Sequence, residues 1–65
     1  MKILVNGAEM AIPEAATIAH LLDLLEFKGR FAVEINGEII ARSQYAHHHL
    51  AADDRVEVVR AIGGG

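Results

Sequence analysis

The dipeptide Asn-Gly occurs twice in this chain, at Asn6-Gly7 and at Asn36-Gly37, each time directly after a short stretch rich in apolar residues. Both central residues of a type I′ turn need a positive φ angle, which Asn and Gly tolerate better than other residues. Each dipeptide therefore predicts a β-hairpin. The hairpins are expected to join strands at residues 2–6 and 8–12, and strands at residues 31–36 and 38–40.

Between the hairpins the sequence predicts one short amphipathic helix. Thr17 is the expected N-cap, because its hydroxyl can accept a hydrogen bond from a free backbone N–H of the first turn. Gly29 is expected to end the helix, since glycine tolerates the left-handed conformation that often follows the last turn. Apolar residues recur at positions i, i+3, i+4 and i+7 and form one stripe: Ile18, Leu21, Leu22 and Leu25.

The rest of the chain completes an α+β fold. Residues 42–52 have no clear period and are expected to hold a short helical turn, and residues 55–60 form the last predicted strand. A right-handed crossover places the helix on one face of the sheet, and the simplest closed arrangement sets the last strand parallel to the first in the centre. We therefore predict a β-grasp, a mixed sheet of four to five strands with one main helix on one face. Residues 1–60 form this domain, and residues 61–65 form a flexible C-terminal tail.

Composition excludes several classes of function. The chain has 65 residues and no cysteine, which allows one domain and excludes a disulfide, a thiolate nucleophile and a cysteine-based metal site. Its net charge of −3 is spread along the chain, without the clustered Lys and Arg of a nucleic-acid binder. The apolar runs are too short for a membrane span. We expect a cytoplasmic protein with neither a nucleic-acid nor a membrane partner.

The sequence offers no catalytic constellation. Ser43 is the only serine, and the four histidines are His20 and the run His47-His48-His49. Adjacent side chains point in different directions, so consecutive histidines rarely converge on one metal ion. We expect no catalytic residue, no metal and no bound cofactor, and the histidine run is left without a role.

Glycine fills the last three positions, Gly63, Gly64 and Gly65, shortly after the last predicted strand. One interpretation is a frayed end or an expression scar. The other is a tail from Ile62 onward that threads a narrow tunnel in a partner, because a backbone without side chains is thin. Such a tail delivers the carboxylate of Gly65. Coupling it to AMP creates a good leaving group, and a sulfur nucleophile then yields a thiocarboxylate without any catalytic side chain in the carrier.

Strand parity predicts a docking face on the side of the sheet away from the helix. If the neighbours of Leu4 pack under the helix, Leu4 points to the opposite face. With Val56 and Val58 in the core, Val59 points outward as well. Neighbouring central strands are then expected to bring Leu4 close to Val59, as a small apolar patch beside the tail. Plain packing or neutral exposure of both residues is the alternative.

Three stretches resemble the ThiS family of sulfur-carrier proteins, and the resemblance extends over essentially the full length. They are residues 1–7, residues 32–40, and residues 53–59 followed by Ile62-Gly63-Gly64-Gly65. The resemblance implies a ubiquitin-like β-grasp and a role in thiamine biosynthesis. Gly64 and Gly65 match the terminal glycine pair of the family, Gly63 departs from its pattern, and Arg42 matches a position that is often basic, to which we assign no role.

The resemblance also implies a set of partners. An adenylyltransferase related to the ubiquitin-activating enzymes consumes ATP to adenylate Gly65, a cysteine desulfurase relay supplies sulfur, and thiazole synthase receives it. Three alternatives stay open. In the first, the chain is the small subunit of molybdopterin synthase, although those chains tend to be longer. In the second, it is a ubiquitin-like modifier joined to lysines through Gly65. In the third, it is an interaction module with an inert tail.

Overall fold

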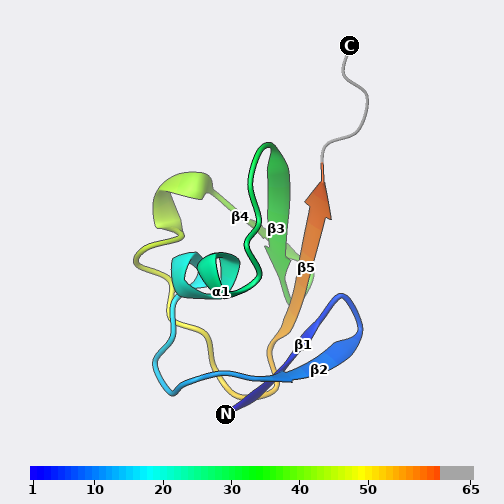
Figure 1. Cartoon of the computed structure of the whole chain (residues 1–65), viewed down its shortest axis with the longest axis vertical. Helices are drawn as coiled ribbons and strands as arrows, with labels where there is room; N and C mark the ends of the chain where they lie inside the picture. The colour runs from blue at the N-terminus through cyan, green and yellow to red at the C-terminus, as the bar shows by residue number, and fades with distance from the viewer. Residues whose placement is uncertain (61–65) are drawn as a thin grey trace.

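The computed structural model describes residues 1–60, and the remaining residues, 61–65, are left out of the description. The elements follow the expected order along the chain (Figure 1). They are β1 (Lys2–Val5), β2 (Ala8–Ala11), α1 (Ile18–Leu24), β3 (Phe31–Ile35), β4 (Glu38–Ile40), the 3-10 helix η1 (Arg42–Gln44) and β5 (Arg55–Arg60).

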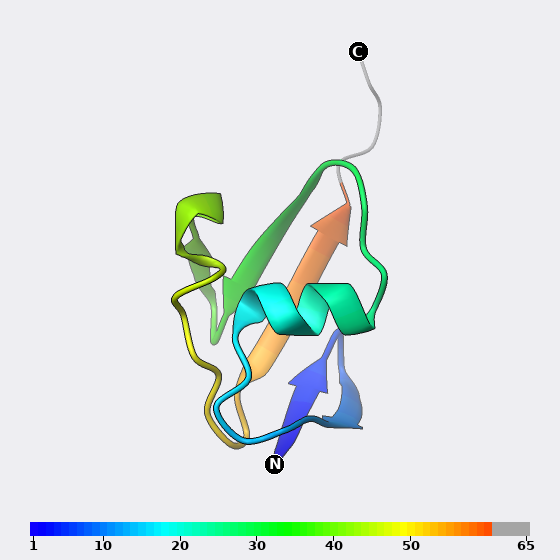
Figure 2. The same cartoon turned by 60° about the vertical axis from the view of Figure 1, so that its left-hand side comes forward.

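Within residues 1–60 the strands form one five-stranded mixed sheet in the order β2-β1-β5-β3-β4. Strands β1 and β5 are parallel and lie at the centre, while the two antiparallel hairpins β1–β2 and β3–β4 lie outside. Helix α1 crosses one face of this sheet (Figure 2). The predicted β-grasp is confirmed, including the central position of the last strand.

Both hairpins turn at their Asn-Gly dipeptides, as predicted. The φ angles are 50° at Asn6 and 85° at Gly7, and 53° at Asn36 and 86° at Gly37. Both central residues of each turn are thus left-handed, which is the geometry of a type I′ turn. The expected strand ends are correct to within one residue, since β2 ends at Ala11 and β3 at Ile35.

Helix α1 starts as predicted and ends earlier than predicted. The Thr17 hydroxyl oxygen accepts a hydrogen bond of 3.1 Å from the backbone N–H of His20. The expectation that Gly29 ends the helix is wrong, because the left-handed residue after the C-cap is Glu26, at φ 56°. The backbone N–H of Phe27 then bonds to the Leu22 carbonyl at 3.0 Å and that of Glu26 to the Asp23 carbonyl at 3.1 Å. These two bonds form a Schellman motif.

The hydrophobic core lies between α1 and the covered face of the sheet. The segment after β4 closes one end of it, where Tyr45 and Leu50 are buried. The predicted short helical turn in this segment is confirmed as η1. The largest fully buried side chains come from the helix and from the three inner strands: Ile3, Ile18, Leu21, Val33 and Val56. This core holds β5 between β1 and β3, up to Arg60, the last described residue.

Candidate functional site

The predicted sulfur-carrying residue Gly65 and the tail residues Ile62, Gly63 and Gly64 lie outside the described residues. Their roles stay predictions. The structure instead describes the end of β5, Val58 to Arg60, which precedes these residues in the chain and is called here the base of the tail (Figure 1). The candidate site is therefore built from this base and from the sheet face around it.

Strand β5 is paired differently on its two edges. On the β3 edge the antiparallel register extends along the whole strand, from Val56 opposite Ile35 to Arg60 opposite Phe31. On the β1 edge the parallel register covers only the start of the strand, where Val5 lies opposite Val56. Beyond Val56, β1 turns away into its hairpin, and β5 continues towards the tail (Figure 1).

The Asn6 side chain continues the ladder where β1 ends. The backbone N–H of Asn6 donates to the Val56 carbonyl at 2.8 Å, which is the last backbone bond between these strands. The side-chain Oδ1 then accepts from the backbone N–H of Val58 at 2.9 Å, and Nδ2 donates to the Val58 carbonyl at 3.4 Å. The Asn-Gly pattern predicts only the turn role of Asn6, so this second role was not predicted from the sequence.

The second turn asparagine, Asn36, fixes the other end of the same strand. Its Oδ1 accepts from the backbone N–H of Arg55 at 2.9 Å, and its Nδ2 donates to Oδ1 of Asp54 at 3.0 Å. The two hairpins thus contribute one asparagine each to β5. Asn36 holds the start of the strand, and Asn6 holds the part next to the tail.

An aromatic row lies under the end of β5 on the helix side. The guanidinium carbon of Arg60 is 5.3 Å from the centre of the Phe27 ring. Phe27 is tilted against Phe31 with ring centres 5.6 Å apart, and Phe31 stacks on Tyr45 at 6.3 Å. A cation–π contact at an exposed position contributes about 0.5–1 kcal/mol. The contact with Phe27 favours one position of the side chain of Arg60, the last described residue.

The two predicted docking residues share the open face but do not meet. Leu4 lies opposite Arg55 and Val59 opposite Ala32. Val59 therefore lies about 13 Å further along β5 than Arg55, the partner of Leu4, at a rise of about 3.3 Å per residue. The predicted proximity is wrong, because the parallel register pairs β1 with the start of β5. Leu4 is half-buried, whereas Val59 is 52% exposed.

Val59 has different apolar neighbours on this face. Ile39 on β4 is 73% exposed, the largest exposure of a big apolar side chain among the described residues. It lies opposite Glu34, which lies opposite Glu57 on β5. We call the set Ala32, Glu34, Ile39, Glu57 and Val59 the open-face patch. Ile39 was not predicted as a docking residue, although its alternation with the inward-facing Ile40 placed it on this face.

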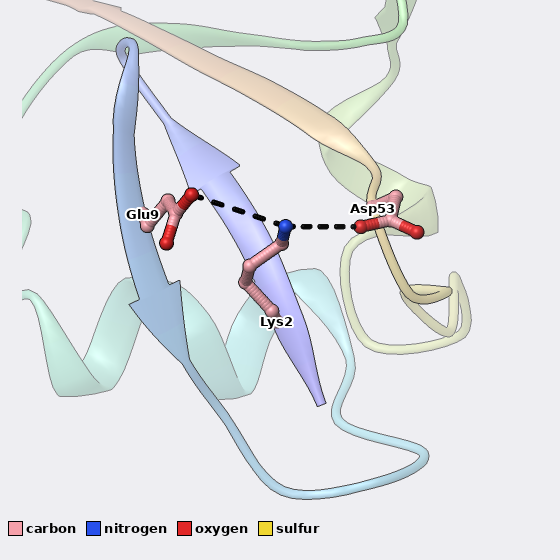
Figure 3. Close-up of polar contacts among 3 residues, drawn as sticks. All are labelled: Lys2, Glu9 and Asp53. Carbon is pink, nitrogen blue, oxygen red and sulfur yellow. Dashed lines mark ion pairs between the residues drawn. The ribbon is translucent and has the colours of Figure 1, made fainter.

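The ion pairs among residues 1–60 lie away from the open-face patch. Lys2 Nζ is 3.9 Å from Glu9 Oε2 and 3.5 Å from Asp53 Oδ1 (Figure 3). The two ion pairs of Lys2 link the start of β1 to β2 and to the loop before β5. All three side chains are largely exposed, so each pair contributes less than about 1 kcal/mol. Within the described part of the chain, Glu34 and Glu57 have no cationic partner.

The histidines do not form a site. His20, His47 and His49 are exposed and His48 is half-buried. The run contributes its backbone, since the N–H of Ile18 bonds to the His48 carbonyl at 3.1 Å. Residues 1–60 hold no group of three His, Cys, Asp or Glu side chains suited to a metal ion, and they enclose no pocket. None of their helices has the length and apolar character needed to cross a membrane.

Comparison with known proteins gives consistent matches. A family model described as the ThiS family matches residues 3–65. The sulfur carrier protein ThiS of Escherichia coli is 32% identical over 66 residues, and the match covers 100% of both chains. The crystal structure of the thiamine biosynthesis protein ThiS from Geobacter metallireducens superposes with a TM-score of 0.83 at 29% identity, again over 100% of both chains.

A second kind of relative is much longer than this chain. Thiazole synthases from Paramagnetospirillum magneticum and Magnetococcus marinus are each 39% identical over 66 residues. The match covers 100% of this chain and 20% of each synthase, so the chain spans about a fifth of their length.

Proposed function

Because this chain belongs to the ThiS family, we propose that it is a sulfur carrier of thiamine biosynthesis that works through the carboxylate of Gly65. The observation that carries this proposal is the extent of the family match, which runs through the three glycines to residue 65. The fold supports it, since a central strand leads directly towards those glycines.

The proposed cycle has three steps. The Gly65 carboxylate attacks the α-phosphorus of ATP on a partner related to the ubiquitin-activating enzymes, and pyrophosphate leaves. In the second step, the persulfide of a cysteine desulfurase relay attacks the acyl carbon, AMP leaves, and an acyl disulfide forms; a thiol then attacks the relay-side sulfur of that S–S bond, so that a new disulfide forms and the thiocarboxylate is released. Thiazole synthase then takes the sulfur. Thiazole synthase is proposed as the acceptor because two such synthases each contain a segment, about a fifth of their length, that is 39% identical to this chain.

In this proposal the domain supplies binding and position, and the partners supply catalysis. The carrier holds no cofactor and has no catalytic side chain, and ATP is consumed on the activating enzyme. It acts in the cytoplasm, where ATP is available. Docking uses the open face, to which Leu4 and Val59 both contribute, with Ile39 as a further exposed apolar contact. Exposed apolar side chains of this kind are typical anchors of protein interfaces.

The test is the intact mass of the chain after incubation with the activating enzyme, ATP and a sulfur donor. We expect a gain equal to the replacement of one oxygen by sulfur, mapped to Gly65. A variant lacking Gly64 and Gly65 is the control and gains no mass. No gain with an activating enzyme that converts another ThiS protein would contradict the proposal.

The acceptor is tested separately, since molybdopterin synthase uses the same tail chemistry. The thiocarboxylated chain is offered to thiazole synthase and to the large subunit of molybdopterin synthase, and we expect sulfur transfer to the first. Isopeptide products on lysines would instead indicate a protein modifier.

A further inference from the structure

We propose that Asn6 is a positioning residue for the tail, residues 61–65. Its side chain holds Val58 in the sheet and thereby fixes the point from which the tail leaves the domain. The proposal rests on the proposed function, in which Gly65 must reach reacting atoms held by a partner.

The Asn6 side chain bonds to β5 close to the end of that strand. Val58 is the last residue of β5 that is held on the β1 edge by a hydrogen bond within residues 1–60, and Asn6 supplies both the acceptor and the donor. Without that side chain the backbone contact between these strands stops at Val56. The segment from Val58 to Arg60 is then held on the β3 edge alone.

The turn itself does not require asparagine at position 6. Position 6 needs a positive φ, and here φ is 50°. Glycine and aspartate also satisfy a type I′ turn at this position. Glycine has no side chain to bond Val58, and aspartate retains the acceptor but lacks the donor. The turn and the hold on Val58 are therefore separable by substitution.

The chain contains a matched control for Asn6. Asn36 occupies the equivalent turn position, at φ 53°, and also bonds to β5 through its side chain. Its bonds go to Arg55 and Asp54 at the start of the strand, away from the tail. Replacing either asparagine by glycine removes comparable bonds, but only Asn6→Gly loosens the base of the tail.

Loosening the base affects delivery of the carboxylate more than docking. A looser base lets the reactive end sample more positions, which lowers its effective concentration at the reacting phosphorus. Most residues of the open-face patch are on β3 and β4. The two on β5, Glu57 and Val59, stay paired with β3, so binding of the domain is retained. If the full free energy of one such hydrogen bond, about 1 kcal/mol, is lost from the positioning of the tail, kcat falls about fivefold, with KM unchanged.

The experiment measures kcat and KM for adenylation of Asn6→Gly, Asn6→Asp, Asn36→Gly and the unaltered chain by ATP–pyrophosphate exchange. Amide hydrogen exchange at Val58 and Arg55 is followed on the same proteins. For Asn6→Gly we expect faster exchange at Val58 and about a fivefold lower kcat. For Asn36→Gly we expect faster exchange at Arg55 and an unchanged kcat. Asn6→Asp retains the bond to the Val58 N–H and most of the rate.

Equal kcat values for Asn6→Gly and Asn36→Gly, with the unaltered chain active, would overturn the positioning role and leave the carrier function intact. If the unaltered chain is not adenylated, the carrier function itself fails and the positioning role fails with it. Urea unfolding shows that each variant is folded. If Asn6→Gly does not fold, Asn6→Ala and Asn36→Ala take the place of the two glycine variants, because alanine also removes the side-chain bonds, and equal kcat values for these two variants would overturn the proposal.

Discussion

Glu34 on β3 lies directly opposite Glu57 on β5, so two carboxylates face each other across the open face of the sheet. Like charges directly opposite in a sheet are destabilising, and no cation among residues 1–60 pairs with either one. The pair lies between the exposed side chains of Ile39 and Val59. The register therefore leaves an unrelieved like-charge repulsion inside the open-face patch.

Neutralising one member of this pair is expected to stabilise the domain. Glu34→Gln removes the repulsion and raises the free energy of unfolding by about 0.2–1 kcal/mol. The gain shrinks as salt screens the charges. Urea unfolding at low and high ionic strength measures both effects, with Glu38→Gln on β4 as an exposed control. An equal gain for the control would show that relief of net charge, rather than this pair, is responsible.

A glycine is expected to suit position 26 better than glutamate. Glu26 has φ 56° in the Schellman motif that ends α1, and a left-handed non-glycine residue costs about 1 kcal/mol or more. Glu26→Gly therefore raises the free energy of unfolding by up to about 1 kcal/mol. The greater conformational entropy of glycine in the unfolded chain offsets part of this gain. Thermal unfolding measures the change. Lys28→Gly, at a position without positive φ, is the control and lowers stability.

Charge placed on the open face is expected to weaken docking. Val59→Glu puts a third carboxylate beside Glu57 and removes an exposed apolar contact, and we expect about a tenfold higher Kd for the activating enzyme. Titration calorimetry measures it, and urea unfolding confirms that the variant is folded. Leu4→Glu is also expected to weaken binding, but less, because Leu4 is half-buried beside Arg55. Unchanged affinity for both variants would remove the docking role of this face.

A side chain in the glycine segment is expected to hinder activation without affecting the fold. Gly64→Ala adds a methyl group to a tail that must enter a narrow tunnel, so kcat/KM for adenylation should fall by about tenfold. The melting temperature should not change, because the core is built from residues 1–60. Pyrophosphate exchange and thermal unfolding test the two statements. Normal adenylation of Gly64→Ala would argue against a close-fitting tunnel.

The fold was predictable from the sequence where the determinants are local. The Asn-Gly turns set their own φ angles, and Thr17 caps the helix through a residue three positions away. The end of α1 was missed because the Schellman bonds override the poor preference of Glu26 for its conformation. Strand alternation assigned the buried and exposed sides of β5 correctly, since it depends only on the pleat.

The candidate site was less predictable because it depends on how distant strands align. Parity places Leu4 and Val59 on one face but says nothing about the offset between β1 and β5, which the parallel register sets. The bonds from Asn6 to Val58 likewise exist only because β5, far away in the sequence, lies beside the first turn. The exposure of Ile39 follows from the edge position of β4, a property of the whole sheet.

The central place of β5 has a consequence for how the protein is made. Of the described strands it is the last to leave the ribosome, yet it is the one that joins the two hairpins into a sheet. An isolated two-stranded hairpin is at best marginally stable in water. A chain that stops before Arg55 therefore has two unjoined hairpins and no open-face patch. The topology itself therefore excludes incomplete translation products from docking. Only chains translated through β5, the strand that precedes the glycines in the sequence, acquire the open-face patch.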